Sequence, residues 1–186
     1  KDYLSQLPLE VTGRTNRRSR VYYDFSSKGD DTKQLIPEQI ILKRWRKLSN
    51  KAHVYHGCRL GPNVWRPLGK LDFQAPDWIE QVQVLHRIKL ARSTTISSLE
   101  AMRSTLGTDK LVALNAFCQA MLARDKFGTP DLFLWVRDKR TKRYLFGTFV
   151  EVKKPKEPIS EDQKLMLWSM KRMQVEPRRV CRRLIC

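Results

Sequence analysis

The second half of the chain contains two apolar runs separated by a short basic stretch. The runs Leu132–Val136 and Phe149–Val152 stand on either side of Asp138–Arg143. Strands that are covered on both faces lose the alternation of apolar and polar side chains. The pattern therefore predicts a buried β-hairpin whose turn is basic.

Helical spacing of apolar residues predicts helices elsewhere in the chain. The predicted helices cover residues 36–48, 77–91, 93–106, 108–125 and 160–173. Ser160 and Gln163 form a capping box at the start of the last helix, and we expect Leu165, Trp168 and Met173 to face the sheet.

The remaining segments carry weaker signals. Residues 178–186 alternate roughly, which predicts a final strand, and residues 21–25 form a possible short strand. Residues 49–76 contain three prolines and are predicted to be a loop, with Trp65 and Phe73 pinning it to the core.

Three charged residues interrupt the predicted hairpin, and they are the candidate chemistry of the chain. Asp131 precedes the first strand, and Glu151 and Lys153 lie two residues apart in the second, so they share a face. Burying such charges costs several kcal/mol unless they are paired. One interpretation is a structural Glu–Lys pair. The other is that the two carboxylates hold Mg²⁺, which takes oxygen ligands, while Lys153 holds the attacking water.

At these residues the chain resembles the PD-(D/E)XK nucleases. The motif is Pro130-Asp131 followed by Glu151-Val152-Lys153. Gly-x-Pro-Asp-Leu, Val-Glu-Val-Lys-x-Pro and a later Ser-x-x-Gln are similar to the VRR-NUC branch, and within it to the nuclease domain of the Fanconi-associated nucleases. The resemblance covers roughly residues 108–185 and is weak before residue 108.

This resemblance implies an α/β fold: a PD-(D/E)XK restriction-endonuclease-like core in which helices flank a mixed central sheet. We expect a basic N-terminal arm over residues 1–34 and a nuclease domain over residues 35–186. Within that domain, a helical insertion covers about residues 77–125, and the motif core covers residues 128–186.

The resemblance also implies a set of site residues. Asp131, Glu151 and the backbone carbonyl of Val152 would bind Mg²⁺ or Mn²⁺, Lys153 would act in catalysis, and Gln163 would complete the active-site signature. Glu38 is the candidate acid on the first helix, although a glutamate there also simply complements the helix dipole. The longer domains of this family place that acid after a glycine. The matching segment here, residues 56–59, contains a glycine but no acidic residue.

The net charge of +18 favours a polyanionic partner, most simply nucleic acid. The family implies DNA rather than RNA, although the sequence alone does not distinguish the two. A solvated basic surface is the alternative. The candidate phosphate contacts are Arg137, Lys139, Arg140, Lys154, Arg178, Arg179, Arg182 and Arg183.

Cysteine usage and hydropathy bear on location. Four cysteines without Cys-x-x-Cys spacing predict free thiols in a reducing, intracellular compartment. For a eukaryotic protein this would be the nucleus or another compartment that contains DNA, and for a bacterial or viral protein it would be the cytoplasm. His53, His56 and Cys58 form a short cluster that we interpret as a loop without metal. No apolar stretch approaches 18 residues, so no membrane partner is expected. The chain does not begin with Met, which suits a processed form or a part of a larger protein or assembly.

We therefore expect a metal-dependent nuclease that hydrolyses phosphodiester bonds in DNA, structure-specific and linked to repair or recombination. Two alternatives stay open. One is an inactive nuclease fold that binds nucleic acid as a structural subunit of a nucleoprotein assembly. The other is a basic adaptor for protein partners.

Overall fold

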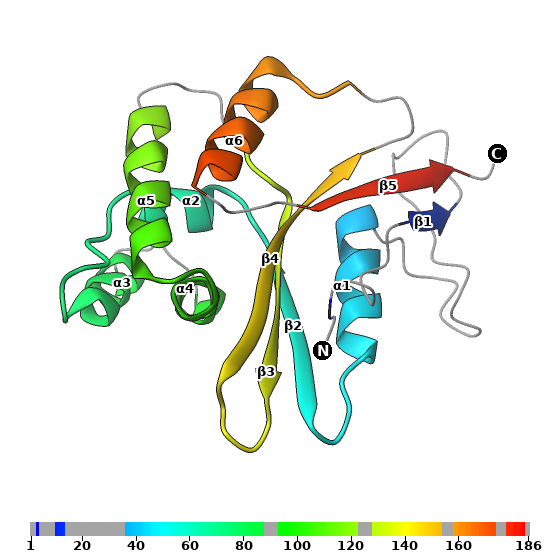
Figure 1. Ribbon diagram of the computed structural model, residues 1–186, viewed down its shortest axis with the longest axis horizontal. Helices are drawn as coiled ribbons and strands as arrows, with labels where there is room; N and C mark the ends of the chain where they lie inside the picture. Colours follow the sequence, from blue (N-terminus) through cyan, green and yellow to red (C-terminus); the bar gives the residue numbers. More distant parts are fainter. Residues whose placement is uncertain are drawn as a thin grey trace.

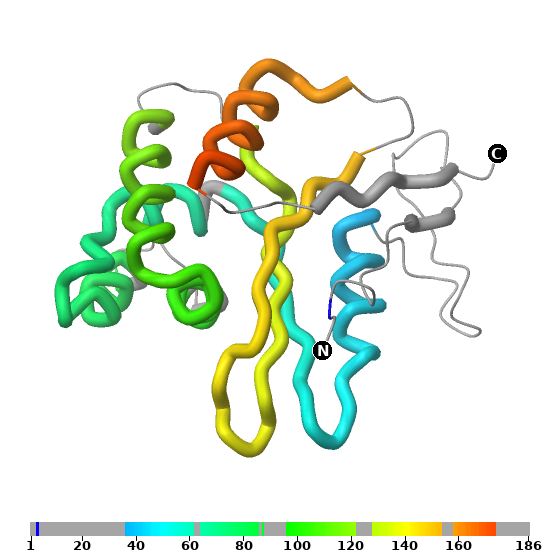
Figure 2. Tube along the Cα trace, in the orientation of Figure 1, coloured from blue at the N-terminus to red at the C-terminus, as the bar shows by residue number. Residues whose placement is uncertain are grey.

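The computed structural model describes residue 3 and residues 10–13, 36–87, 93–122, 128–153, 158–173 and 178–184 (Figures 1 and 2). For residues 10–13 and 178–184 it describes the backbone only. Lys154 and the possible strand at residues 21–25 lie outside the described part. No helix in the described ranges is long and apolar enough to span a bilayer.

A five-stranded mixed sheet forms the centre of the fold, in the order β1-β5-β4-β3-β2. β4 pairs antiparallel with β3, β3 pairs antiparallel with β2, and β5 runs parallel to both β4 and β1. The strands are β1 (Glu10–Gly13), β2 (His53–Arg59), β3 (Leu132–Asp138), β4 (Tyr144–Lys153) and β5 (Arg178–Leu184). The predicted hairpin is confirmed as β3 and β4, and the predicted final strand as β5.

Helices cover both faces of the sheet (Figure 1). The helix α1 (Pro37–Lys47) packs on one face. The helices on the other side are α2 (Pro62–Leu68), α3 (Trp78–Arg87), α4 (Ser93–Leu106), α5 (Thr108–Leu122) and α6 (Glu161–Arg172). The mixed sheet flanked by helices is therefore confirmed, and α3 to α5 occupy the stretch expected to be a helical insertion.

The strand alternation divides the apolar side chains between two cores. Leu132, Leu134 and Val152 pack with α1, whereas Phe133 and Phe149 pack with the helices on the opposite face. Because both faces are buried, neither face of the hairpin needs polar side chains. This arrangement explains the nearly continuous apolar runs of the sequence.

The prediction of a loop over residues 49–76 is wrong, because this segment contains β2 and α2. β2 is a short antiparallel strand that includes Gly57, and α2 has Pro62 in its first turn and Pro67 inside it. Glycine and proline usually mark loops. Here Pro62 starts a helix, where a missing N–H costs nothing. Trp65 and Phe73 are buried, as predicted.

Two smaller expectations are also corrected. Residues 10–13, which were expected to belong to an arm, form β1 and pair with β5 through backbone hydrogen bonds. Trp168 was expected to face the sheet but is 56% exposed, with the guanidinium of Arg172 over its ring. The division of the chain into an arm and a domain otherwise stays a prediction.

Candidate active site

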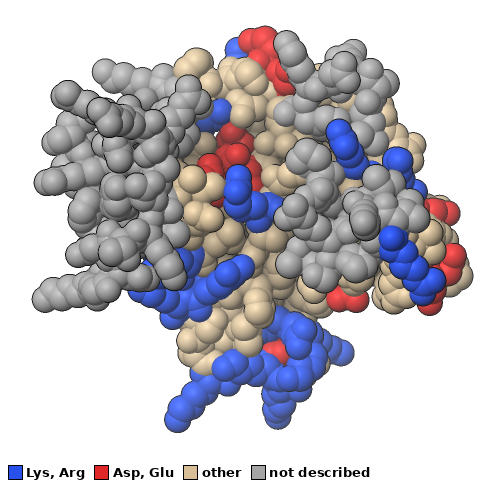
Figure 3. Space-filling view, turned by 180° about the vertical axis from the view of Figure 1, so that it is seen from behind, with Lys and Arg blue, Asp and Glu red and all other residues tan. Residues whose placement is uncertain are grey.

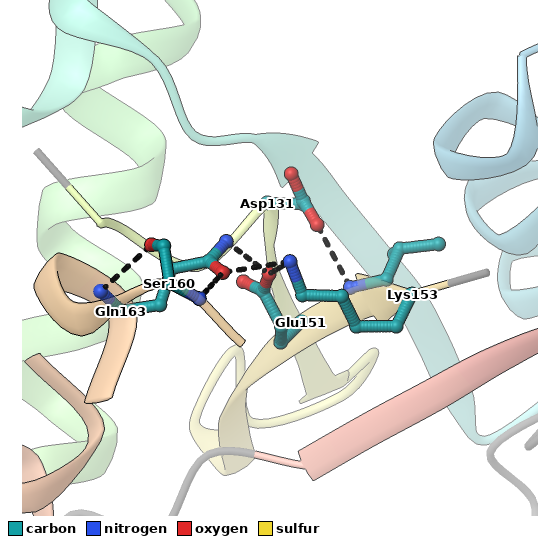
Figure 4. A network of polar contacts seen from close by, with 6 residues as sticks. Asp131, Glu151, Lys153, Ser160 and Gln163 are labelled. Carbon is teal, nitrogen blue, oxygen red and sulfur yellow. Dashed lines mark hydrogen bonds and ion pairs between the residues drawn. The ribbon is translucent and has the colours of Figure 1, made fainter. Parts of the chain in front are cut away.

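Strand alternation brings Asp131, Glu151 and Lys153 to the same face of the sheet. Asp131 stands two residues before Phe133, and Glu151 stands two residues after Phe149, and both phenylalanines face the helices α2 to α6. β3 and β4 are antiparallel, with Leu132 opposite Val150. The start of β3 therefore lies beside the end of β4, and Asp131 and Glu151 are neighbours there (Figure 4).

Asp131 is hydrogen-bonded to the backbone of β4, the strand that carries Glu151 and Lys153. The backbone N–H of Val152 donates a hydrogen bond of 2.8 Å to Oδ2 of Asp131. This contact orients the Asp131 carboxylate toward the backbone of residues 151–152. The pairing that the motif implied, one acid on each strand beside a shared backbone segment, is present in the structure.

Glu151 and Lys153 form a buried ion pair. Nζ of Lys153 lies 3.2 Å from Oε1 of Glu151, and each residue is 4% exposed. The mutual attraction in such a pair offsets the loss of hydration only when further hydrogen bonds satisfy the remaining atoms. The structure supplies these bonds from α6.

Gln163 supplies the additional hydrogen bonds. Its Oε1 accepts from Nζ of Lys153 at 2.7 Å, and its Nε2 donates to Oε1 of Glu151 at 2.8 Å. The same Oε1 also accepts from the backbone N–H of Ser160 at 3.1 Å, while Oγ of Ser160 accepts from the N–H of Gln163 at 3.3 Å. Gln163 thus caps the helix and contacts the charged pair at the same time (Figure 4).

The rotation of α6 about its axis explains both the site and the core beneath it. Gln163, Met166 and Met170 are spaced by three and four residues and therefore share one helix face. Met166 and Met170 are buried against the sheet, so Gln163 points to β4. Trp168 falls on another face, which is why it is exposed.

Gly128 lets the chain pass against the start of α6. A Cβ built on Gly128 would overlap the N atom of Gln163 and lie 2.5 Å from the carbonyl oxygen of Asp162. Real Cβ atoms do not come this close to backbone, so only glycine fits. Gly128 was part of the predicted motif, but its role as a spacer between the motif loop and α6 was not evident from the sequence.

Glu38 lies in the first turn of α1 and is half-buried. The C-terminal end of α1 leads into β2 beside the β3–β4 turn, where the N–H of Lys139 bonds the carbonyl of Ala52 at 2.9 Å. The first turn of α1 therefore lies at the opposite end of the sheet, which is the end that carries Asp131 and Glu151 (Figure 1). The participation of Glu38 as a metal ligand stays a prediction.

The basic candidates fall into two places. Lys139 and Arg140 are exposed at the β3–β4 turn and Arg137 is half-buried near it, so all three are far from the carboxylates. Arg178 and Arg179 begin β5, where the backbone of Arg179 is in register with Glu151. Arg182 and Arg183 follow in the same strand. The side chains of these four arginines lie outside the described part of the chain.

The face in Figure 3 shows both features of the charge distribution. Asp and Glu side chains are grouped in a hollow near the middle of this face, and Lys and Arg side chains gather at the protruding end below. Further Lys and Arg side chains lie between them. A polyanion that crosses this face from the protruding end would meet basic side chains before it reached the acids.

The His53, His56 and Cys58 cluster does not converge. All three residues lie in β2, where an odd spacing places His53 on the opposite face from the other two. Among the described residues, no three His, Cys, Asp or Glu side chains gather in a way that could hold a metal ion. Cys58 and Cys118 are free thiols. Burial raises the pKa of both, that of Cys118 to about 12.

Known proteins resemble this chain both in sequence profile and in fold. The family profile of the VRR-NUC domain matches residues 78–182. A structure of paFAN1 bound to 2nt 5′ flap DNA with a gap is similar with a TM-score of 0.56 and 11% identity, over 96% of this chain and 37% of that chain. A structure of paFAN1 bound to 1nt 5′ flap DNA with a gap has a TM-score of 0.52 and 14% identity, over 83% of this chain and 36% of that chain. No curated protein sequence matches.

The two kinds of comparison support different statements. At these identities the structural likeness concerns the fold, and the chain spans little more than a third of the length of the proteins it resembles. The family profile covers more than half of the chain, including Asp131, Glu151, Lys153 and Gln163. The chain therefore belongs to the VRR-NUC domain family.

Proposed function

We propose that this domain is a metal-dependent nuclease of the PD-(D/E)XK type that hydrolyses phosphodiester bonds in DNA. The observation that carries the proposal is the pair Asp131 and Glu151, held beside one backbone segment with Lys153 at the end of β4. A structural ion pair alone would account for Glu151 and Lys153. Asp131, the second carboxylate on the same face, is not part of that ion pair and accepts its hydrogen bond from the backbone of Val152.

The donor set fits a hard divalent cation. Mg²⁺ is usually held by one or two carboxylates together with waters and substrate phosphate oxygens. Asp131, Glu151 and the backbone carbonyl of Val152 would provide the protein ligands, and Glu38 is the candidate for a further one. When bound, Mg²⁺ or Mn²⁺ would polarise the phosphate and lower the pKa of a water.

The side chains of this protein would divide the remaining work. Lys153 carries a positive charge beside Glu151 and would hold the attacking water or offset negative charge that develops on the phosphate. Gln163 would keep Nζ of Lys153 and Oε1 of Glu151 in place through its two hydrogen bonds. The basic side chains of β5 and of the β3–β4 turn would bind the DNA backbone without reading its sequence.

A structure-specific substrate, such as flapped or branched DNA in repair or recombination, is the expected class. Two observations support it: membership of the VRR-NUC family, and the fold shared with paFAN1 in complexes with flap DNA. The net charge of +18 is consistent with a nucleic-acid partner.

The decisive experiment measures cutting and binding of labelled flap, single-stranded and duplex DNA with Mg²⁺, Mn²⁺ or EDTA. We expect cutting only with metal, and a decrease of at least a hundredfold in Asp131→Asn, which keeps the size of the side chain but removes its charge. Binding in EDTA should persist in this variant. Tight binding by the wild-type chain without cutting in any metal would instead indicate a structural DNA-binding subunit.

A further inference from the structure

A group of exposed basic side chains lies at the end of the sheet away from the carboxylates (Figure 3). Two neighbouring segments form it: the β3–β4 turn and the connection from α1 to β2. Hereafter called the basic tip, it consists of six exposed residues, Lys47, Lys51, Lys139, Arg140, Lys142 and Arg143. For these six, no ion pair is found within the part of the chain that the structure describes.

The basic tip is an ordered structure and not a loose run of charges. Oδ1 of Asp138 accepts from the N–H groups of Arg140 at 2.9 Å and Thr141 at 2.7 Å. These hydrogen bonds hold the pKa of the Asp138 carboxyl below its ordinary value. Oδ1 of Asn50 accepts in the same way from Ala52 and His53, and the N–H of Lys139 ties the two segments together.

Lys142 occupies a backbone conformation that does not suit a lysine. Its φ is 61°, in the left-handed region. A glycine or asparagine there would avoid the steric cost that a residue with a long side chain incurs. A strained backbone conformation in a turn motivates a hypothesis of function, and here the residue that adopts it carries an exposed positive charge.

The position of the basic tip sets a distance from the site. Asp131 and Lys139 are eight residues apart along an extended strand, which corresponds to about 26 Å at about 3.3 Å per residue. Phosphates on one DNA strand are spaced by about 3.4 Å along the helix axis, so this distance corresponds to about seven or eight base pairs. The acidic hollow and the positively charged end lie on one face of the molecule (Figure 3).

We propose that the basic tip binds the phosphate backbone of a DNA duplex about eight base pairs from the scissile phosphate, so that productive binding requires a duplex arm of about this length. The inference rests on the proposed nuclease function and adds to it a fixed spacing between the cut and the second contact. The strands β3 and β4 act as the spacer.

The test compares DNA substrates whose duplex arm, on one side of the flap and then on the other, is 4, 8 or 16 base pairs long. Dissociation constants are measured by fluorescence anisotropy in EDTA, and cutting is measured separately with Mg²⁺. For the wild-type chain we expect affinity to rise at least tenfold between 4 and 8 base pairs on one side, with little further gain at 16.

Two variants isolate the basic tip. In Lys139→Gln/Arg140→Gln, the gain in affinity between 4 and 8 base pairs should disappear. The negative slope of log affinity against log salt should become shallower by about 0.9 for each phosphate that is no longer neutralised. Lys142→Gly should also make that slope shallower, while the midpoint of thermal unfolding stays unchanged or rises. A merely structural lysine would not produce this combination.

The matched control is Lys70→Gln/Arg87→Gln, which removes the same charge from exposed positions after α2 and at the end of α3. It should keep the arm-length gain. Disappearance of the gain in this control as well, or its retention in the tip variant, would overturn the inference. An equal gain with single-stranded arms would also overturn it.

Failure of this inference and failure of the proposed function give different results. Metal-dependent cutting without any arm-length gain would refute the basic tip and leave the nuclease assignment intact. A tip-dependent gain in binding with no cutting would refute the nuclease assignment and leave a two-point DNA-binding surface.

Discussion

At the scale of single residues, the site depends on how Glu151 and Lys153 remain charged in an apolar environment. Each is almost fully buried, and the pair lies on the face of the sheet that also carries Phe133 and Phe149 of the larger apolar core. Gln163 satisfies one acceptor of Glu151 and one donor of Lys153. The pair and its glutamine therefore form a unit whose members depend on one another.

This dependence predicts the stability of variants at the pair. Lys153→Met removes the buried ammonium group that lies 3.2 Å from the Glu151 carboxylate, which should lower the free energy of unfolding by about 3–5 kcal/mol. Adding Glu151→Gln removes the buried negative charge while keeping an acceptor for Nε2 of Gln163, and should restore most of the stability. Urea denaturation of wild type, Lys153→Met and the double variant gives the comparison.

Activity and stability should separate in the same series, because the double variant lacks both the carboxylate and the ammonium group. It should be close to wild type in stability and inactive in cutting. If the double variant were as unstable as Lys153→Met alone, the burial argument for the pair would be wrong.

At the scale of elements, the site is an assembly of β4, the segment before β3, and α6. One rotation of α6 places Met166 and Met170 in the core and Gln163 against the charged pair. The segment before β3 reaches Asp131 by passing the start of this helix at Gly128. Anything that moves α6 away from the sheet therefore moves Gln163 and disturbs the path to Asp131.

Gly128→Ala tests this close approach. The added Cβ would meet backbone atoms of Asp162 and Gln163, which cannot rotate away, so α6 must shift. We expect a decrease of about 1–3 kcal/mol in the free energy of unfolding, as for other overpacked sites, and reduced cutting. Thermal or urea unfolding and a cleavage assay provide the measurements.

Gly61→Ala is the control for this prediction, because a Cβ on Gly61 meets nothing within 4 Å. Gly61 precedes α2 as its N-cap, where glycine and alanine differ by at most about 1 kcal/mol. Similar destabilisation in the two variants would show that the close approach of Gly128 to α6 is not what the substitution disturbs.

At the scale of the whole molecule, the sheet separates two cores. The helices α2 to α5 cover the larger core in the part that lies beyond the site. Cys118 of α5 is buried there, and Cys58 of β2 accepts a hydrogen bond from Oγ of Ser98 at 3.1 Å. Burial disfavours the thiolate, so the pKa of Cys118 is raised from 9.0 to about 12.

The raised pKa predicts resistance to alkylation. Only the thiolate reacts, and at pH 8 a shift from 9.0 to about 12 lowers its fraction about a thousandfold. In the folded protein, Cys118 should react with iodoacetamide at least that much more slowly than in urea, and Cys58 should also be slowed. Mass spectrometry of the labelled peptides measures both rates. Rapid labelling of Cys118 in the folded chain would mean that the helical core opens readily.

Elements whose signal is local can be predicted from the amino-acid sequence without knowledge of the fold. An apolar run of residues is enough to indicate a buried strand, which is why β3 and β4 were predicted with their turn. A capping box marks the start of α6 within four residues. The chemistry of the site was also visible, because charged residues are rare in buried strands and Asp131, Glu151 and Lys153 interrupt the apolar pattern.

Tertiary structure alone decided the features that depend on distant residues. β2 and α2 have weak local signals and are stabilised by packing against α1, the sheet and the helical core. The direction of Gln163 was set by which face of α6 the sheet buries, and the need for glycine at residue 128 by a helix that begins only at Glu161. The basic tip also depends on the tertiary structure, because only the pairing of β2 with β3 brings Lys47 and Lys51 beside the β3–β4 turn. Local patterns specify strands and helices, but contacts between them arise from burial and backbone pairing across the whole chain.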